Sequence, residues 1–366
     1  MKPEIGQRVL DRIGQVCPDR THREIATDIG MTPDGFSRAL NGKRSFSSIE
    51  LARVADLLDA DIHWLITGQP DPHRLVVAAR HNFDHQTGRR DVPGRESDEA
   101  VLRDIALAYQ QAFQDAPLAA PSLPDSPAAV RDALGEGFVR PFADRLEAHL
   151  GVDVVRVADV STAYSFTIVG RPVIVVAATG NWFRENWSIA HELGHLALGH
   201  HANGLTDAEW DQHEAAANAF AARLLLPAEQ MRGSDWASIS ADELAQRVWD
   251  SGVSTEALAR RLSSLTVPTG DVIEEWAAQP TQRLIRRHWN APEADGDPIT
   301  QRMDEAATRR FPLSLQDAHL KMIAAGDLGK GTLAWMLGVD PDALEVDAPQ
   351  PTAEVDSDLL AEALGL

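Results

Sequence analysis

The residues best suited to carry chemistry lie in one stretch, WSIAHELGHLALGHH, which runs from Trp187 to His201. Within this apolar, helix-forming run stand His191, Glu192 and His195. Two histidines four residues apart lie on one face of an α-helix, so both imidazoles can reach a single zinc ion. Glu192 projects roughly 100° further round the helix, where it can hydrogen-bond a water on the metal without ligating the metal itself. The spacing H-E-x-x-H therefore predicts a zinc hydrolase site.

A catalytic zinc site needs a third protein ligand, and the sequence offers candidates in two places. His201 falls at the last position of the metzincin pattern H-E-x-x-H-x-x-G-x-x-H. However, Leu198 occupies the glycine position of that pattern, and the glycine has moved to Gly199. The remaining candidates lie in the next predicted helix and are Asp211, His213 and Glu214. The displaced glycine argues against His201 as the ligand.

Glu214 is better placed than the other candidates. On a helix it aligns with Ala217 and Asn218 one turn later, and Ala221 lies two turns on. Small residues on that face allow close approach to the helix that carries the two histidines. A glutamate from a helix packed against an H-E-x-x-H helix is the arrangement of gluzincin peptidases, so Glu214 is the favoured third ligand.

A small sheet and two helices must position these residues. Residues 152–157, 163–170 and 172–179 are predicted strands, and the third is so apolar that we expect it to be buried on both faces. The HELGH helix follows directly, and a second strong helix begins near residue 207 and ends near Pro227. This order predicts an α+β, zincin-like peptidase domain over residues 127–232, with a three-stranded sheet and an H-E-x-x-H helix.

The flanking regions are predicted to be mostly helical. Residues 1–70 form an all-helical unit, residues 71–126 a linker with one helix, and residues 233–366 a helical C-terminal region. In the first unit, Gly30 is expected just after the second helix, with Thr32 capping the third.

The paired motif H-E-L-G-H and E-x-x-A-N-x-F-A-x-x-L-L-x-P resembles the ImmA/IrrE metallopeptidases over residues 127–265. Its second half begins here at Glu214 and ends at Pro227, with Leu226 where the family often has Met. The resemblance implies zinc as the cofactor, with His191, His195 and Glu214 as its ligands and Glu192 as general base. It also implies cleavage of a partner repressor, which derepresses genes.

The expected mechanism is metal-assisted peptide hydrolysis. Zinc lowers the pKa of water and polarises the scissile carbonyl, while Glu192 carries the water proton to the leaving amine. A further donor should stabilise the transition state. Tyr164, His200 and His201 are the candidates, and the sequence does not choose among them.

The N-terminal residues resemble helix-turn-helix repressors of the XRE/Cro type. The matching residues are THREIATDIGMTPDGFSRALNGKRS and IELARVADLLDADIHWLITG. The resemblance implies that the third helix enters the major groove and that the following loop contacts phosphates. The expected DNA-contacting residues are Thr32, Asp34, Ser37, Arg38, Lys43 and Arg44. The alternative for this unit is a helical protein-interaction module.

Composition limits the partners and the compartment. The chain of 366 residues has a net charge of −21, so DNA binding requires a local basic patch that works against the overall field. The single cysteine, Cys17, excludes an internal disulfide and a cysteine-rich zinc site. No stretch is apolar enough to span a membrane, and the charged N-terminus does not resemble a signal peptide. We therefore expect a cytoplasmic protein without a membrane partner.

Together these features predict a zinc-dependent endopeptidase that regulates transcription by cutting a partner regulator, a repressor by analogy. We also expect it to bind an operator through residues 1–70, its N-terminal helical unit, which we call the head. A homodimer is expected if the operator is two-fold symmetric. The alternatives are a non-proteolytic transcription factor that uses the zincin domain as a sensor, and an antitoxin-like repressor. The intact Glu192 favours the peptidase, because a zinc-holding sensor has no need of a base.

Overall fold

The computed structural model describes residues 5–18, 20–58, 60, 62–68, 78–79, 82–84, 89–91, 95–113, 121–201, 206–290 and 296–346. The chain divides into two compact units, Met1–Arg74 and Leu75–Leu366, each with its own buried core. Among the described residues, no helix combines the length and apolar character needed to cross a membrane.

The smaller unit is all helical. Its elements are α1 (Ile5–Val16), α2 (His22–Asp28), α3 (Pro33–Leu40), α4 (Ser48–Leu57) and α5 (Ile62–Thr67). Apolar residues at helical spacing fill its core, among them Ile25, Ile29, Phe36 and Leu40.

The turn between α2 and α3 follows from two residues. Gly30 lies just past α2 with a φ of 71°, a left-handed conformation that suits glycine. Thr32 then caps α3 through its hydroxyl, which accepts a hydrogen bond from the amide of Gly35. The predicted helix end and helix start are both confirmed.

The larger unit is built round a four-stranded sheet in the order β1-β5-β6-β4. Its strands are β1 (Ala78–Ala79), β4 (Asp153–Val157), β5 (Tyr164–Ile168) and β6 (Arg171–Ala177). β4 runs parallel to β6, whereas β5 is antiparallel to both β6 and β1. The three strands predicted from the sequence are confirmed.

Short strands also occur where the sequence predicts only a linker with one helix. β1 joins the sheet, and β2 (Asn82–Asp84) pairs with β3 (Arg89–Asp91) in a separate two-stranded ribbon. Elements of two or three residues are too short to leave an alternating pattern in the sequence.

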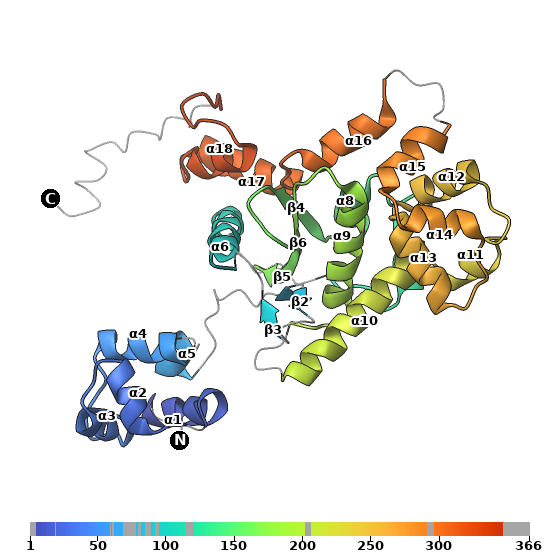
Figure 1. Ribbon diagram of the computed structural model, residues 1–366. Helices are drawn as coiled ribbons and strands as arrows, with labels where there is room; N and C mark the ends of the chain where they lie inside the picture. The colour runs from blue at the N-terminus through green and yellow to red at the C-terminus, as the bar shows by residue number, and fades with distance from the viewer. Residues whose placement is uncertain are drawn as a thin grey trace, which may run out of the picture. The chain divides into compact units, whose positions relative to one another are not determined.

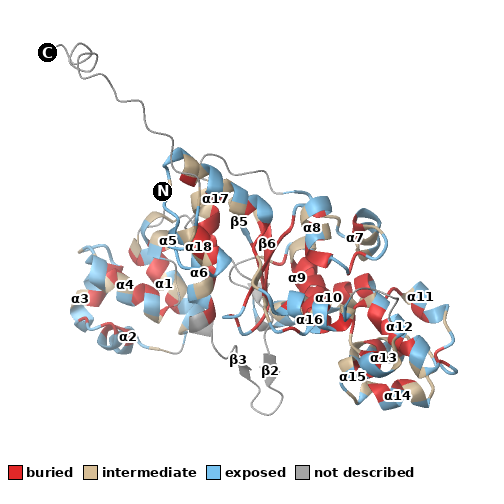
Figure 2. Cartoon of the chain, turned by 90° about the horizontal axis from the view of Figure 1, so that it is seen from above, coloured by how far each residue is buried: buried red, intermediate tan, exposed pale blue. Residues whose placement is uncertain are grey.

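Helices cover both faces of the sheet (Figure 1). One face packs against α8 (Phe142–Leu150) and α9 (Trp182–Ala197), and the other against α6 (Arg95–Ala112) and later helices. β6 supplies Ile174 and Val176 to the first core and Val173 and Val175 to the second, so this strand is buried on both faces as predicted. Figure 2 shows β6 and much of α9 in red, the colour of buried residues.

The other helices of this unit precede α8 or follow α9 in the chain, and many of them contribute residues to the same cores. They are α7 (Pro127–Leu134), α10 (Asp207–Leu225), α11 (Ala228–Arg232), α12 (Ala241–Ser251), α13 (Thr255–Ser264), α14 (Asp271–Ala277), α15 (Thr281–His288), α16 (Pro298–Ala307), α17 (Leu313–Ala325) and α18 (Gly331–Leu337). α17 and α18 contribute Leu315, Ile323 and Leu333 to the core that also contains α6 and the second face of the sheet.

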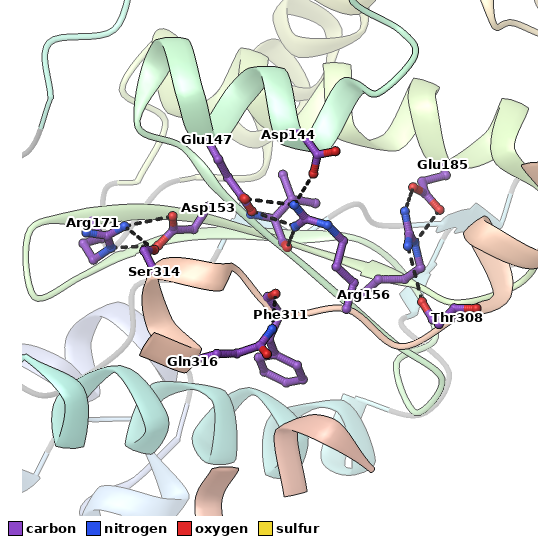
Figure 3. Close-up of polar contacts among 12 residues, drawn as sticks. Asp144, Glu147, Asp153, Arg156, Arg171, Glu185, Thr308, Phe311, Ser314 and Gln316 are labelled. Atoms are coloured by element: carbon purple, nitrogen blue, oxygen red, sulfur yellow. Dashed lines mark hydrogen bonds and ion pairs between the residues drawn. The ribbon is translucent and has the colours of Figure 1, made fainter. Parts of the chain in front are cut away.

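Polar contacts join the chain after α16 to the outer edge of β4 (Figure 3). Arg310 and Arg156 exchange two backbone hydrogen bonds, of 2.8 and 2.9 Å, and form an isolated antiparallel bridge. The Arg310 guanidinium also donates to Glu147 and Asp144, and that of Arg156 donates to Glu185. The segment that leads into the C-terminal helices is thereby attached to β4, an edge strand of the sheet.

Candidate metal centre

Close packing of α9 against α10 forms the candidate site. A Cβ atom added at Gly194 would lie 3.1 Å from Cβ of Phe220 and 3.2 Å from Cα of Ala217, too close for easy accommodation. Glycine inside a helix costs about 1 kcal/mol relative to alanine. The tight approach of the two helices accounts for glycine at this position, and the small residue at 217 is fully buried, as its place in the motif suggests.

Three side chains from these two helices converge. Nε2 of His191 lies 3.1 Å from Nε2 of His195, and the two nitrogens lie 3.4 and 3.3 Å from the oxygens of Glu214. Both histidines are fully buried, while the Glu214 side chain is 20% exposed and borders the site on its outer side. Among the described residues, this is the one group whose donor atoms are arranged to hold a metal ion.

The chemistry of the three donors fits a cation. Burial would raise the pKa of the Glu214 carboxyl, but hydrogen bonding and charge from the two histidines outweigh it and lower that pKa to about 2. Glu214 is therefore ionised. Nδ1 of His191 lies 3.2 Å from Oδ1 of Asn218 and donates to it, so Nε2 is the ring nitrogen left to face a metal ion. A cation among these electron-rich atoms would satisfy all three.

A second layer of side chains holds the two imidazoles. Asn218 is an exposed residue, and its amide nitrogen donates to the backbone carbonyl of Glu214. Nδ1 of His195 lies 3.1 Å from Nδ1 of His200, which is buried and stacks on His213 with ring centroids 4.0 Å apart. Burial and the neighbouring histidines lower the pKa of His200 to about 4, so this ring is neutral and its Nδ1 can accept a hydrogen bond from the Nδ1–H of His195.

The alternative ligand candidates lie elsewhere. His201 directs Nε2 toward the backbone carbonyl oxygen of Ser165, 3.1 Å away, and burial together with His195 lowers its pKa to about 4. His213 stacks on His200, and Asp211 is exposed on the first turns of α10. None of these three belongs to the converging group formed by the two histidines and Glu214.

The three candidate transition-state donors, Tyr164, His200 and His201, do not all lie on the same face of the sheet. The Tyr164 hydroxyl donates to Asp98, 2.6 Å away, within the core formed with α6. Successive residues of a strand point to opposite faces, so Ser165, the next residue, faces α9 instead. His200 and His201 remain on the side of the converging group, whereas Tyr164 lies behind the sheet.

Glu192 has a partner that the sequence analysis missed. Its carboxylate is fully buried, and Oε2 accepts a hydrogen bond of 2.7 Å from the hydroxyl of Ser165. The one signal available in the sequence is a serine at an inward position of an otherwise apolar strand, and strand alternation alone does not say which helix residue it meets.

The residues suggested for DNA contact are the N-cap of α3, residues within α3 and residues of the loop after it. Thr32, Asp34, Ser37, Arg38 and Lys43 are exposed. Arg44 is only partly exposed, because its guanidinium donates to the carbonyl of Gly35 and to the carboxylate of Glu50. Arg44 therefore braces α3 against α4, which distinguishes it from the other five.

Comparison with known proteins gives one family match, and it lies within the larger unit. Residues 147–263 match the family model of the IrrE N-terminal-like domain, Peptidase_M78. The matched segment, less than half of the chain, runs from α8 to α13 and includes both helices of the candidate site. No curated protein and no solved structure gives a significant match. The family match indicates a metallopeptidase-like domain, in agreement with the ImmA/IrrE resemblance of the sequence.

Proposed function

We propose that this protein is a zinc-dependent endopeptidase with a DNA-binding head, and that it regulates transcription by cleaving a partner regulator. The observation that carries the peptidase proposal is the convergence of His191, His195 and Glu214 beside the buried carboxylate of Glu192. The family match over the same helices supports it.

Zinc is the metal that best suits these donors. Zinc–nitrogen and zinc–oxygen bonds of about 2.0–2.2 Å place the ligand atoms of a tetrahedral site about 3.3–3.6 Å apart. Here the two imidazole nitrogens lie 3.1 Å apart, and those of His191 and His195 lie 3.4 and 3.3 Å from Oε2 and Oε1 of Glu214, respectively, so all of these atoms are within reach of one small cation. Two imidazoles and one carboxylate also form a typical catalytic zinc set that leaves a fourth position open.

The reaction expected of the site is hydrolysis of a peptide bond. Bound zinc would polarise the scissile carbonyl and supply a nucleophilic water at neutral pH. Glu192, one residue along α9 from His191, accepts the proton of the attacking water and delivers it to the departing amide nitrogen. Asn218 and His200 hold the two imidazoles in the tautomer that presents Nε2.

The substrate we propose is a transcriptional regulator, a repressor by analogy with the ImmA/IrrE resemblance. The test is metal analysis of the purified full chain, followed by incubation with candidate repressors encoded nearby. We expect about one zinc per chain and a discrete cleavage product. Zinc without cleavage of any candidate would favour a sensor that retains the metal, and the absence of zinc would refute the proposal.

The two residues behind the imidazoles give a graded prediction for zinc affinity. Loss of such partners typically weakens metal binding roughly 10–100-fold. We expect His200→Leu to lie near the upper end, because it leaves Nδ1 of His195 buried without an acceptor. Asn218→Ala should lie near the lower end, because water can replace an exposed amide. Competition titration with a zinc chelator measures both, and the reverse order would contradict this account of the imidazoles.

The DNA-binding proposal for the head predicts a specific loss. We expect Arg38→Ala with Lys43→Ala to weaken binding of the full chain to its operator by about 1–3 kcal/mol and to flatten the salt dependence. Both side chains are exposed, so the fold should be unaffected. Fluorescence anisotropy at several salt concentrations measures the effect, with Lys321→Ala, an exposed lysine of the other unit, as the control. If the unaltered protein binds no genomic fragment at low salt, the head is a docking module instead.

A further inference from the structure

The carboxylate of Glu192 is held by a hydroxyl from the sheet. Glu192 and Ser165 are both fully buried, and Ser165 Oγ donates to Glu192 Oε2 across 2.7 Å. This distance is that of a well-formed hydrogen bond between a hydroxyl and a carboxylate oxygen. A buried hydroxyl is unfavourable unless it is hydrogen-bonded, so this contact accounts for a serine at the position.

The strand gives Ser165 a fixed position. β5 is paired along its length with β6, and Ser165 lies opposite Ile174 in that ladder. Its neighbours Tyr164 and Phe166 are anchored in the core on the other face of the sheet. Ser165 is therefore presented to α9 by a strand that pairs with β6 on one edge and with β1 on the other, and whose neighbouring side chains pack on the opposite face of the sheet.

His201 supports the same residue from the loop after α9. Its Nε2 lies 3.1 Å from the carbonyl oxygen of Ser165 and 3.3 Å from Oγ. The carbonyl can only accept, so Nε2 carries the proton and His201 donates. Ser165 is thus held through both its backbone and its side chain.

We propose that Ser165 is the positioning residue for Glu192, holding the carboxylate in the rotamer that receives the proton of the attacking water. This inference rests on the proposed peptidase function. Ser165, on the sheet, orients the base. The two imidazole ligands are instead oriented by Asn218 on α10 and by His200 in the segment just after α9. Removing the hydroxyl should therefore slow the chemical step without releasing the metal.

The test compares three variants of the full chain. Ser165→Ala should lower kcat roughly 10–100-fold, the range typical of residues that orient a functional group at a metal site, with KM and zinc content unchanged. Ser165→Thr keeps the hydroxyl and should restore most of the activity. Thr167→Ala removes a hydroxyl two residues along the same strand, at an exposed position, and should behave as the unaltered protein.

A second measurement does not depend on activity or on zinc. In the zinc-free protein, Ser165→Ala should lower the urea midpoint of unfolding, because it removes the donor to a buried carboxylate. In a Glu192→Leu background the acceptor is already gone, and the same substitution should leave the midpoint unchanged or raise it. Equal losses in both backgrounds would show that the hydroxyl serves only the fold.

The outcomes separate the two proposals. If the zinc-loaded unaltered protein cleaves no candidate substrate, the proposed function fails, while the unfolding series still measures the Ser165–Glu192 interaction. If the unaltered protein cleaves and Ser165→Ala has the same kcat, the positioning role is wrong. A parallel fall in kcat and zinc content would also overturn it, since the hydroxyl would then maintain the centre as a whole.

Discussion

Glu192→Gln is expected to abolish peptide cleavage while the protein keeps its zinc. Glutamine has the size of glutamate and can still accept the hydrogen bond from Ser165, but it cannot take a proton from water. Loss of a positioned general base typically costs roughly 10²–10⁴-fold in rate. The three ligand side chains are untouched, so zinc content should equal that of the unaltered protein.

The measurement is the rate of product formation from the identified substrate, together with zinc per chain. Glu229→Gln, at an exposed glutamate of α11 outside the site, is the matched control and should cleave normally. Undiminished cleavage by Glu192→Gln would mean that another group acts as the base. Loss of zinc in this variant would mean that Glu192 is itself needed to hold the metal.

Glu214→Ala is expected to have the largest effect on the metal. It removes one of three converging ligands and leaves two imidazoles, so the loss should exceed the roughly 10–100-fold expected for a residue behind the ligands. Asp211→Ala lies nearly one turn earlier on the same helix, at an exposed position outside the converging group, and should keep its zinc.

Dialysis against a chelator, followed by metal analysis, compares the two variants directly. Glu214→Gln should fall between them, because an amide oxygen can still ligate but carries no charge. If Glu214→Ala retained zinc as well as the unaltered protein, the third ligand would lie elsewhere.

Much of the architecture could be predicted from local sequence patterns. The alternation and apolar runs of β4, β5 and β6 extend over five to seven residues each, which is long enough to mark strands. Gly30 and Thr32 mark a helix end and a helix start by chemistry that acts within a few residues. The three donors of the candidate metal centre could be predicted for a similar reason, because His191 and His195 lie on one regular helix and Glu214 on the next.

The supporting residues could not be predicted, because their contacts depend on packing between distant elements. Ser165 and Glu192 are separated by 27 residues, and their contact depends on how β5 lies against α9. His200 follows α9 in a polar stretch that suggests an exposed loop, yet it is buried between His195 and His213. Arg44 is of a residue type that commonly binds phosphate. Its ion pair with Glu50 could not be predicted, because it depends on how α4 packs near the loop after α3.

The bridge between Arg156 and Arg310 bears on how small a working enzyme can be. The segment that matches the family model ends at residue 263, well before the bridge and before the helices that cover Val173 and Val175. In a fragment trimmed to that segment, one apolar face and one edge of the sheet would be exposed to water, and we expect such a fragment to aggregate. A fragment that keeps the candidate site therefore has to extend beyond the matched segment to include α6, α17 and α18, and residues more than a hundred positions downstream of His191 and His195 belong to the scaffold of the sheet.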